Sequence, residues 1–518
     1  MSMYNCIKII IYIYYYFYFL QIMLYFLLPK NNNFNLYKKI NYSSNNVSYS
    51  TEPLVSTSLS YYLNDVKKQI DEYKEEWDVY KKYTNPYEYI HSNLPTCIYS
   101  KINVHSDFKY LNNEIKYKKN IINGNCLSFY KPLSRSYFKM IEIIKTFNIE
   151  EIMNYISEDI IVQVQESSSQ CFTENKRNSS FFAKKTADSS FITNGFCKPP
   201  PFPPHKTTES FLYSGIQQKR QQSNYYNMQN EFGGGGGGCG EVISKKINTF
   251  HLAEGPGGFI EAIVNLRNNP YDTYIGMTLI NNKNPNIPSW KKSLFFLNNN
   301  KNVFIENGFD KKGDILNFEN FKFCVAKYGS SMHLITGDGG FDFSSDFNNQ
   351  EMTIVQLLFA QVAFAVCMQK QGGVFILKIF DCFFSHTVDI LYLLSSFYEK
   401  VHICKPQTSR VANSEKYIVC INFLPSSNID FYPYFYLCFE KMRQKTKSNT
   451  ERFLNVNISN AFLTKLEEYN SIIGHQQIEN IYNTINLIKI KQKNKFDKIN
   501  TLIKNNIQKS IYWCDRYL

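Results

Sequence analysis

One stretch, Thr249 to Ile260 (TFHLAEGPGGFI), limits the folds open to this 518-residue chain more than any other. An apolar strand runs into a Gly-Pro-Gly-Gly turn and then into the start of a helix. Gly255, Gly257 and Gly258 remove side chains where the backbone turns sharply, and the first turn of the helix offers unpaired N–H groups to a ligand. The spacing differs from the dinucleotide fingerprint G-x-G-x-x-G. Taken alone, the stretch predicts either a nucleotide pocket or a plain strand–helix turn.

Two further apolar runs end in polar residues. Residues 333–336 (HLIT) lead into a Gly-rich turn that contains Asp338, and residues 373–379 (GVFILKI) carry Lys378 near their end. The segment between them has the long apolar pattern of a helix. Strands alternating with helices predict an α/β, doubly wound sheet, in which ligands lie outside the carboxyl ends of the strands. Glu254, Asp338 and Lys378 all fall at such ends.

Two segments flank this core. Residues 132–145 (PLSRSYFKMIEIIK) predict a helix with Ser134 or Ser136 as its N-cap, and Lys139 lies off its apolar face. Downstream, the stretch KPQTSRVANSEKYIVC leaves one strand, crosses a polar loop and enters another strand, with Glu415 just before the second strand. We expect a final hairpin here.

These five motifs, in this order, resemble those of the FtsJ-like RNA 2'-O-ribose methyltransferases, and within them the cap-specific mRNA branch. SRSYFKMIEI is similar to the family's first-lysine helix, HLAEGPGGFIEA to its S-adenosylmethionine loop, GDGGFD to its aspartate motif, GGVFILKIF to its second-lysine strand and SRVANSEKYIVC to its glutamate motif. The resemblance covers most of residues 80–518. It implies a Rossmann-like class I methyltransferase sheet flanked by helices, and a catalytic Lys-Asp-Lys-Glu tetrad at Lys139, Asp338, Lys378 and Glu415.

The resemblance also implies S-adenosyl-L-methionine as the cofactor and no metal. The cofactor-binding positions that it carries over are Glu254, Gly255, Pro256, Gly257, Gly258, Phe259, Asp314 and Asp338. Alternatively, Asp314 caps a helix. The second strand, residues 274–278, ends without the acidic residue that nucleotide-binding sheets use for a ribose. Glu306, at the end of the presumed third strand, is a substitute candidate.

Methyl transfer to a ribose explains the need for these residue types. The 2'-hydroxyl is a poor nucleophile, so it has to be held in line with the methyl group while its proton is removed. Only a neutral lysine can accept that proton, and burial or a second cation such as Lys139 lowers the pKa of Lys378. Asp338 and Glu415 oppose this effect. Singly, each of the four is better explained as a surface or turn residue, but their joint occurrence in family order favours the tetrad.

Composition is compatible with an RNA partner. The formal net charge is +13 and aromatic residues make up 16% of the chain, so phosphate attraction and base stacking are both available. An AT-rich genome would produce the same bias. We expect RNA as the substrate, most specifically capped mRNA methylated at its first transcribed nucleotides. The alternatives are methylation of ribosomal or transfer RNA, and a non-catalytic RNA-binding or polymerase-accessory role on the same fold.

The chain divides into five parts by composition. They are a hydrophobic, low-complexity segment (1–60), a helical part with the first catalytic lysine (61–165), a low-complexity insertion (166–240), the methyltransferase core (241–425) and a carboxyl-terminal helical region (426–518). Six consecutive glycines and a proline run predict that the insertion is flexible and disordered. Residues 65–83 predict one amphipathic helix.

The amino terminus permits two interpretations. Residues 9–28 have the length of a membrane span, but six tyrosines lie within them and no small-residue cleavage site follows. A true start at Met23 is the other explanation, and we expect no stable membrane association. The 13 cysteines lack C-x-x-C pairs, which indicates neither a disulfide framework nor a zinc site. An intracellular compartment, cytoplasmic or nuclear, is expected.

Overall fold

The computed structural model describes residues 23–46, 52–95, 117–164 apart from 118 and 122, 240–280, 289–340, 349–444 and 448–518. The chain divides into two compact units, Met1–Ile160 with Ile243–Leu518, and Ile161–Val242. Strands β3 (Glu158–Val164) and β4 (Gly240–Lys246) pair as a two-stranded sheet. The predicted insertion, apart from its last residue, lies outside the described residues.

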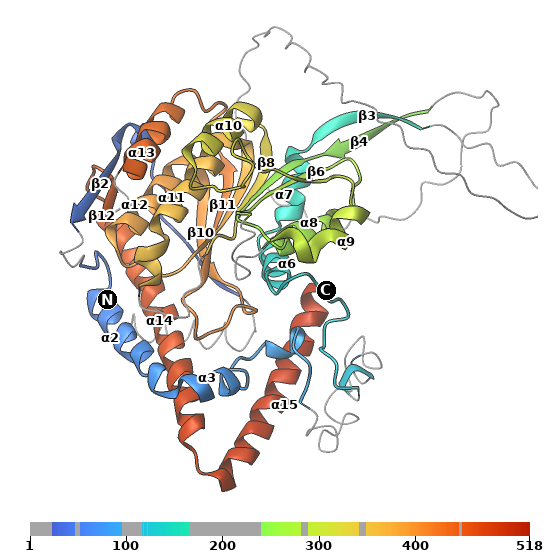
Figure 1. Cartoon of the computed structure of the whole chain (residues 1–518), viewed down its shortest axis with the longest axis vertical. Coiled ribbons are helices and arrows are strands. Elements are labelled where there is room, and N and C mark those ends of the chain that lie inside the picture. Colours follow the sequence, from blue (N-terminus) through green and yellow to red (C-terminus); the bar gives the residue numbers. More distant parts are fainter. Residues whose placement is uncertain are drawn as a thin grey trace, which may run out of the picture. The chain divides into compact units, whose positions relative to one another are not determined.

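An eight-stranded sheet forms the centre of the larger unit (Figure 1). Its order is β1-β10-β11-β9-β8-β5-β6-β7. The strands are β1 (Leu24–Leu27), β5 (Asn248–Leu252), β6 (Thr273–Met277), β7 (Val303–Ile305), β8 (Met332–Gly337), β9 (Gln369–Ile379), β10 (Tyr398–Lys405) and β11 (Lys416–Phe423). Strands β9, β8, β5, β6 and β7 are parallel, whereas β11 is antiparallel to both β9 and β10. The predicted Rossmann-like sheet and its final hairpin are therefore confirmed.

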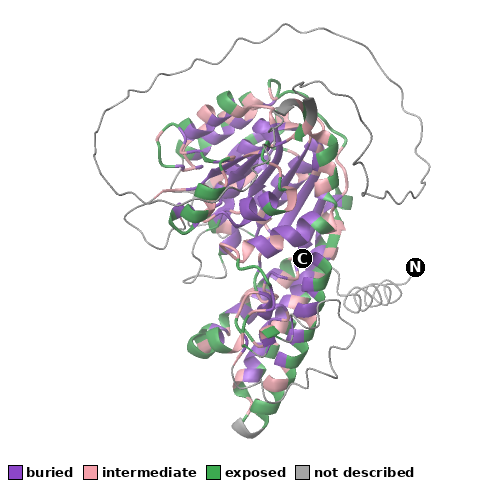
Figure 2. Ribbon diagram, turned by 90° about the vertical axis from the view of Figure 1, so that its right-hand side faces the viewer, coloured by how far each residue is buried: buried purple, intermediate pink, exposed green. Residues whose placement is uncertain are grey.

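Helices cover both faces of the sheet because alternate residues of the strands are apolar on each side. On β9, Phe375 and Leu377 belong to one buried cluster, and Val374 and Ile376 belong to another. The first cluster includes α10 (Phe318–Tyr328), α11 (Gln350–Met368), α12 (Ser385–Phe397) and α13 (Tyr432–Gln444). The second includes α6 (Ser136–Thr146), α7 (Ile149–Ile156), α8 (Gly258–Arg267) and α15 (Gln492–Tyr517). Figure 2 shows the strands as the most completely buried part of this layered arrangement.

A third apolar cluster joins the amino- and carboxyl-terminal helices. Here α14 (Asn460–Lys489) packs against α2 (Thr57–Lys68) and α3 (Lys74–Tyr80), which lie beside it in Figure 1. The prediction of one helix over residues 65–83 is wrong, because α2 ends at Lys68 and the short 3-10 helix η2 (Asp71–Tyr73) precedes α3. The two pieces nevertheless bury their apolar residues against the same helix, which explains why the periodicity continues across the break.

Smaller elements complete the larger unit. A two-stranded sheet joins β2 (Ile40–Asn46) to β12 (Ser448–Leu454). The remaining helical elements are η1 (Leu36–Lys39), η3 (Glu88–Ile90), η5 (Trp290–Ser293) and α9 (Leu294–Asn299).

The amino-terminal apolar stretch contributes to the sheet. Residues 9–22 lie outside the described residues, but Leu24–Leu27 pair with β10 as strand β1, and the flanking Met23 and Leu28 are buried. The interpretation of residues 9–28 as a membrane span is therefore wrong for its last part. Among the described residues, one helix is long and apolar enough to cross a membrane, α11, and 83% of its apolar window is buried inside the protein.

Candidate active site

The Gly-rich turn between β5 and α8 is organised by Glu254. Its Oε1 accepts hydrogen bonds from the backbone N–H groups of Phe259 at 2.6 Å and Ile260 at 3.3 Å. A carboxylate in this position satisfies first-turn donors and complements the helix dipole. Gly257, the N-cap of α8, has a φ of 105°, which a residue with a side chain rarely adopts. The glycine in the motif is thus required by the backbone of the turn.

The second oxygen of the same carboxyl group has no such role. Oε2 of Glu254 is buried and has no hydrogen-bond partner among the described residues. Burial and the nearby Asp338 carboxylate raise the pKa of Glu254 well above its usual range. A buried acceptor without a partner is costly unless a ligand donates to it. The site at the carboxyl end of β5 is therefore suited to a ligand with a donor group.

Asp338 and Lys378 form the first of two ion pairs. Asp338 directly follows β8, and Lys378 lies on the neighbouring strand β9. Lys378 Nζ lies 3.0 Å from Asp338 Oδ1 and donates to the Asp338 backbone oxygen at 2.7 Å. On the other side of β9, the hydroxyl of Tyr417 donates to Asp338 Oδ1 at 3.4 Å. Asp338 thus holds the lysine amine, and Tyr417 from β11 in turn binds the Asp338 carboxylate.

Lys139 and Glu415 form the second ion pair. Lys139 Nζ lies 2.7 Å from Glu415 Oε1 and 2.9 Å from Oε2, and Ser409 Oγ donates to Glu415 Oε1 at 2.7 Å. Lys139 is carried by α6. The serine N-cap expected for this helix is wrong: its N-cap is Arg135, and the hydroxyls of Ser134 and Ser136 hydrogen-bond to each other.

The two pairs form one electrostatic cluster in which every side chain is 13% to 19% exposed. Burial lowers the pKa of Lys378, but Asp338 and then Glu415 outweigh it, so the pKa is raised. Burial raises the pKa of Glu415, but Lys139 and Lys378 outweigh it and lower the pKa to about 2. In the free protein Lys378 is therefore an ammonium group and Glu415 a carboxylate. The sequence predicted these opposing effects on the pKa of Lys378, but it could not predict the direction of the net shift.

The turn that holds Asp338 depends on a residue that sequence reasoning did not assign to the site. Gln361, on α11, accepts a hydrogen bond from Gly339 N at 3.0 Å. A Cβ at Gly339 would come within 2.8 Å of the Gln361 amide, and a Cβ at Gly340 within 3.3 Å of Lys378 Nζ. The available signal in the sequence was a glutamine within the apolar second half of this helix.

The other two acidic candidates bind protein groups. Asp314 Oδ1 accepts from Leu316 N at 2.9 Å, and the N-cap of α10 is Asn317, so the alternative that Asp314 is that cap is wrong. Glu306 Oε2 accepts from Lys327 Nζ at 2.8 Å and from the Tyr328 hydroxyl at 2.6 Å. Glu306 is thus used in anchoring α10, which disfavours it as a ribose ligand.

Residues 227–423 match the family model described as FtsJ-like methyltransferase. The chain carries an FtsJ-like methyltransferase domain. Asp338, Lys378 and Glu415 lie within this domain, and Lys139 reaches it from a helix that precedes the matched residues. Among the described residues, no three His, Cys, Asp or Glu side chains gather as a metal site would require.

The chain is also similar to curated proteins. The chain is 40% identical over 119 residues to cap-specific mRNA (nucleoside-2'-O-)-methyltransferase 1 of Trypanosoma brucei brucei, covering 23% of this chain and 32% of that protein. It is 29% identical over 271 residues to cap-specific mRNA (nucleoside-2'-O-)-methyltransferase 2 of Pongo abelii, covering 50% of this chain and 34% of that protein. It is 37% identical over 174 residues to the human methyltransferase 1, covering 32% and 20%. The chain thus matches about a third or less of the length of each of these relatives.

Proposed function

We propose that the protein is an S-adenosylmethionine-dependent RNA ribose 2'-O-methyltransferase that modifies the first transcribed nucleotides of capped mRNA. The proposal rests on one observation: the Lys378–Asp338 and Lys139–Glu415 ion pairs lie together beside the Gly-rich turn. The names of the curated relatives support the choice of a capped substrate. The proposal includes the five-part organisation given above, with residues 241–425 as the core, and an intracellular site of action, cytoplasmic or nuclear.

The residues around the Gly-rich turn fit S-adenosylmethionine. The unpartnered, buried Oε2 of Glu254 offers an acceptor for a donor group such as the amino group of the ligand. The residues proposed to hold the ligand are Glu254, Gly255, Pro256, Gly257, Gly258, Phe259, Asp314 and Asp338. When bound, S-adenosylmethionine supplies an electrophilic methyl group on a positively charged sulfur.

Lys378 is proposed as the general base. Its pKa is raised in the free protein, so the amine has to lose its proton before it can take one from the ribose hydroxyl. Its two acceptors on Asp338 hold the nitrogen in one place. The Lys139–Glu415 pair adds a fixed cation and a fixed acceptor beside it. In this arrangement Lys378 moves the proton, and the other three groups orient the amine and the ribose.

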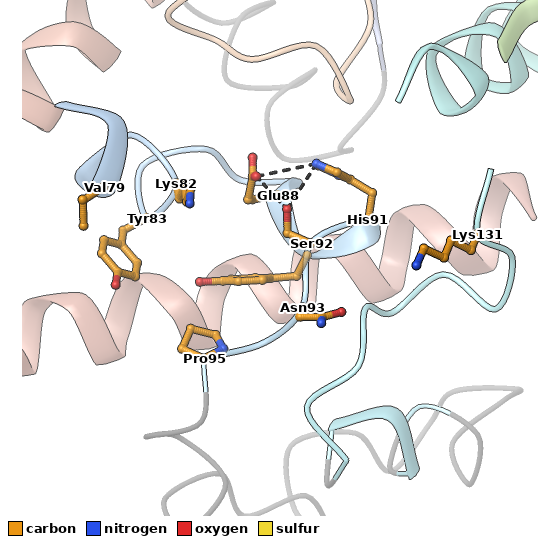
Figure 3. Close-up of a pocket in the computed structure, with 10 residues that line it drawn as sticks. Val79, Lys82, Tyr83, Glu88, His91, Ser92, Asn93, Pro95 and Lys131 are labelled. Atoms are coloured by element: carbon orange, nitrogen blue, oxygen red, sulfur yellow. Dashed lines mark hydrogen bonds and ion pairs between the residues drawn. The ribbon is translucent and has the colours of Figure 1, made fainter. Parts of the chain in front are cut away.

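A pocket of about 540 Å³ beside η3 supports an RNA substrate (Figure 3). Lys82, Lys131 and Tyr83 are among the residues that line it. At its wall, Glu88 Oε2 lies 3.6 Å from Arg135, the residue that precedes α6 and its Lys139. Basic and aromatic side chains in one pocket suit a phosphate and a nucleotide base.

Methyl transfer from radiolabelled S-adenosylmethionine to capped, uncapped and cap-methylated RNA tests the proposal. We expect more label on the capped RNAs than on uncapped RNA. We also expect a loss of about 100-fold or more in Lys378→Met, because general acid–base catalysis contributes about 10²–10⁴-fold. Lys370→Met is the matched control, since Lys370 lies at the other end of β9 and pairs with Glu158 at 2.5 Å. Calorimetry should give both variants the same affinity for the cofactor.

Three other outcomes of these experiments would contradict parts of the proposal. Equal labelling of uncapped RNA would refute the cap assignment and favour methylation of ribosomal or transfer RNA. Absence of label on every RNA would refute catalysis and favour the non-catalytic RNA-binding or polymerase-accessory role. Weak cofactor binding by Lys378→Met alone would show that the lysine supports the fold of the site.

A further inference from the structure

A completely buried carboxylate, Glu142, lies one turn after Lys139 on α6. Its Oε1 accepts from the backbone N–H of Gln407 at 2.7 Å. Its Oε2 accepts from Thr408 N at 3.2 Å, from Thr408 Oγ1 at 3.0 Å and from Trp513 Nε1 at 3.2 Å. Four donors from two distant parts of the chain therefore converge on one side chain.

Three of these four donors belong to Gln407 and Thr408, at the start of the loop that carries Glu415. Residues 406–415 connect β10 to β11, with Gln407 and Thr408 at the start of the loop and Glu415 at its end. The helix α6 thus holds both ends of the loop, through Glu142 at the start and through Lys139 at the end. Ser409, directly after the residues that Glu142 binds, donates to Glu415.

Bonds of this kind resist displacement. Burial raises the pKa of Glu142 to about 7, and losing the acceptor of buried hydrogen bonds leaves every donor unsatisfied, which costs free energy. Without Glu142, the N–H groups of Gln407 and Thr408 and the indole N–H of Trp513 would lose their common acceptor. The start of the loop would then lose these bonds, which would loosen Ser409 and its bond to Glu415, although Lys405 Nζ still binds the backbone oxygens of Asn413 and Glu415.

We propose that Glu142 is a positioning residue for methyl transfer: it fixes the loop of residues 406–415 on α6 and so sets Glu415 against Lys139 and Lys378. This rests on the proposed function, in which Glu415 belongs to the catalytic set. Glu142 touches none of the four proposed catalytic side chains, and its effect passes through the loop. Trp513 extends the same support to α15 at the carboxyl end of the chain.

Steady-state kinetics of Glu142→Gln test the proposal. The amide keeps one acceptor oxygen but turns an NH2 group toward N–H donors, so the loop should loosen while the turn at Glu254 is unchanged. We expect kcat to fall on the order of 10-fold to 100-fold, as for a misplaced catalytic group, with the KM for S-adenosylmethionine within about twofold. Combined with Glu415→Gln, the further loss should be small, because groups that act as a unit are non-additive.

Asp389→Asn is the matched structural control. Asp389, on α12, is also completely buried and accepts from Phe453 N at 2.9 Å, Leu454 N at 3.1 Å and Arg452. This variant should lower the melting temperature and leave kcat unchanged. Wild-type kcat in Glu142→Gln, the same kcat loss in Asp389→Asn, or fully multiplicative losses with Glu415→Gln would each overturn the proposal.

Hydrogen exchange provides a readout that does not depend on activity. In Glu142→Gln the amides of Gln407 and Thr408 should exchange faster, while those of Phe259 and Ile260 should not. Unchanged exchange at residues 406–415 would overturn the inference even if the wild-type protein methylates RNA. An inactive wild-type protein would refute the proposed function, but hydrogen exchange would still test whether Glu142 fixes the loop. If Glu142→Gln does not fold, Thr408→Val removes one of the four donors and should give a smaller change in the same direction.

Discussion

Gly258→Ala should separate the geometry of the site from the stability of the fold. Gly258 begins α8, and a Cβ placed on it would lie 2.2 Å from Ser134 Oγ, 2.3 Å from Ser136 Oγ and 3.2 Å from Tyr137 N. The three obstructing atoms belong to the first residues of α6, the helix that carries Lys139, and to Ser134 just before its N-cap. The absence of a side chain at Gly258 is therefore what allows the two helices to meet.

The size of the effect follows from these distances. Unstrained contact needs about 3.5 Å, so α6 or its serines have to move by roughly 1 Å. Overpacking costs about 1–3 kcal/mol, and replacing Gly by Ala returns about 0.4–1 kcal/mol through the unfolded state, so the net loss of stability is at most about 2–3 kcal/mol. Misplacement by about 1 Å costs on the order of 100-fold in rate. Activity should thus fall much more than stability.

Urea unfolding and methyl transfer, measured on the same preparation, check this prediction. Gly474→Ala is the control, because its Cβ would meet only the flexible end of Leu59 at 2.9 Å in the α2–α14 contact. That variant should keep its activity. Adding Ser134→Ala and Ser136→Ala to Gly258→Ala removes the two nearest atoms and should restore most of the activity.

The result that would refute the reasoning is a Gly258→Ala protein with wild-type kcat. It would show that α6 adjusts to the added methyl group without moving Lys139. Failure of the two serine replacements to restore any activity would instead place the conflict at the backbone of Tyr137.

Two further predictions concern pH. Burial lowers the pKa of Lys378 whereas Asp338 and Glu415 raise it, so Glu415→Gln should move the rising limb of the kcat–pH profile of the residual activity to lower pH; an unmoved limb would contradict the electrostatic coupling. Burial lowers the pKa of His386 from 6.5 to about 3, and neither ring nitrogen has a hydrogen-bond partner among the described residues. The unfolded chain therefore binds the extra proton below pH 6.5, and wild-type stability falls with pH from 6.5 toward 3. In urea unfolding, His386→Leu should be more stable than the wild type by about 1–3 kcal/mol at pH 7. The difference in the free energy of unfolding should grow by about 1.4 kcal/mol per pH unit below pH 6.5. A difference that does not change with pH would show that His386 does not titrate in this way.

The sequence was sufficient for the parts of the molecule that local patterns determine. The strand–turn–helix at Glu254, the helix that bears Lys139 and the hairpin that follows Lys378 all have strong apolar periodicity and turn residues at their ends. Family order then placed four charged residues at one edge of the sheet, and the structure brings them into two contacting pairs. Their catalytic roles stay a prediction.

The sequence could not predict contacts between residues that are far apart in the chain. The pairing of β1 with β10 joins residues as far apart as Leu24 and Lys405, which are separated by 381 positions, and an apolar run of this length has no local mark of a strand. The contact between Glu142 and Trp513 spans 371 positions. The helix predicted over residues 65–83 is broken between α2 and α3, and both pieces pack against α14, which comes from a distant part of the chain.

Strand β1 has a practical consequence for how the protein is expressed. It pairs with residues 402–405 of β10, which would otherwise be the outermost strand of the sheet. An uncovered row of backbone N–H and C=O groups is a template for pairing with another molecule, and short edge strands are one way in which proteins limit it. A recombinant fragment that begins after Leu28 would expose β10 over its full length, and we expect it to self-associate. A fragment that begins at Met23 keeps this protection.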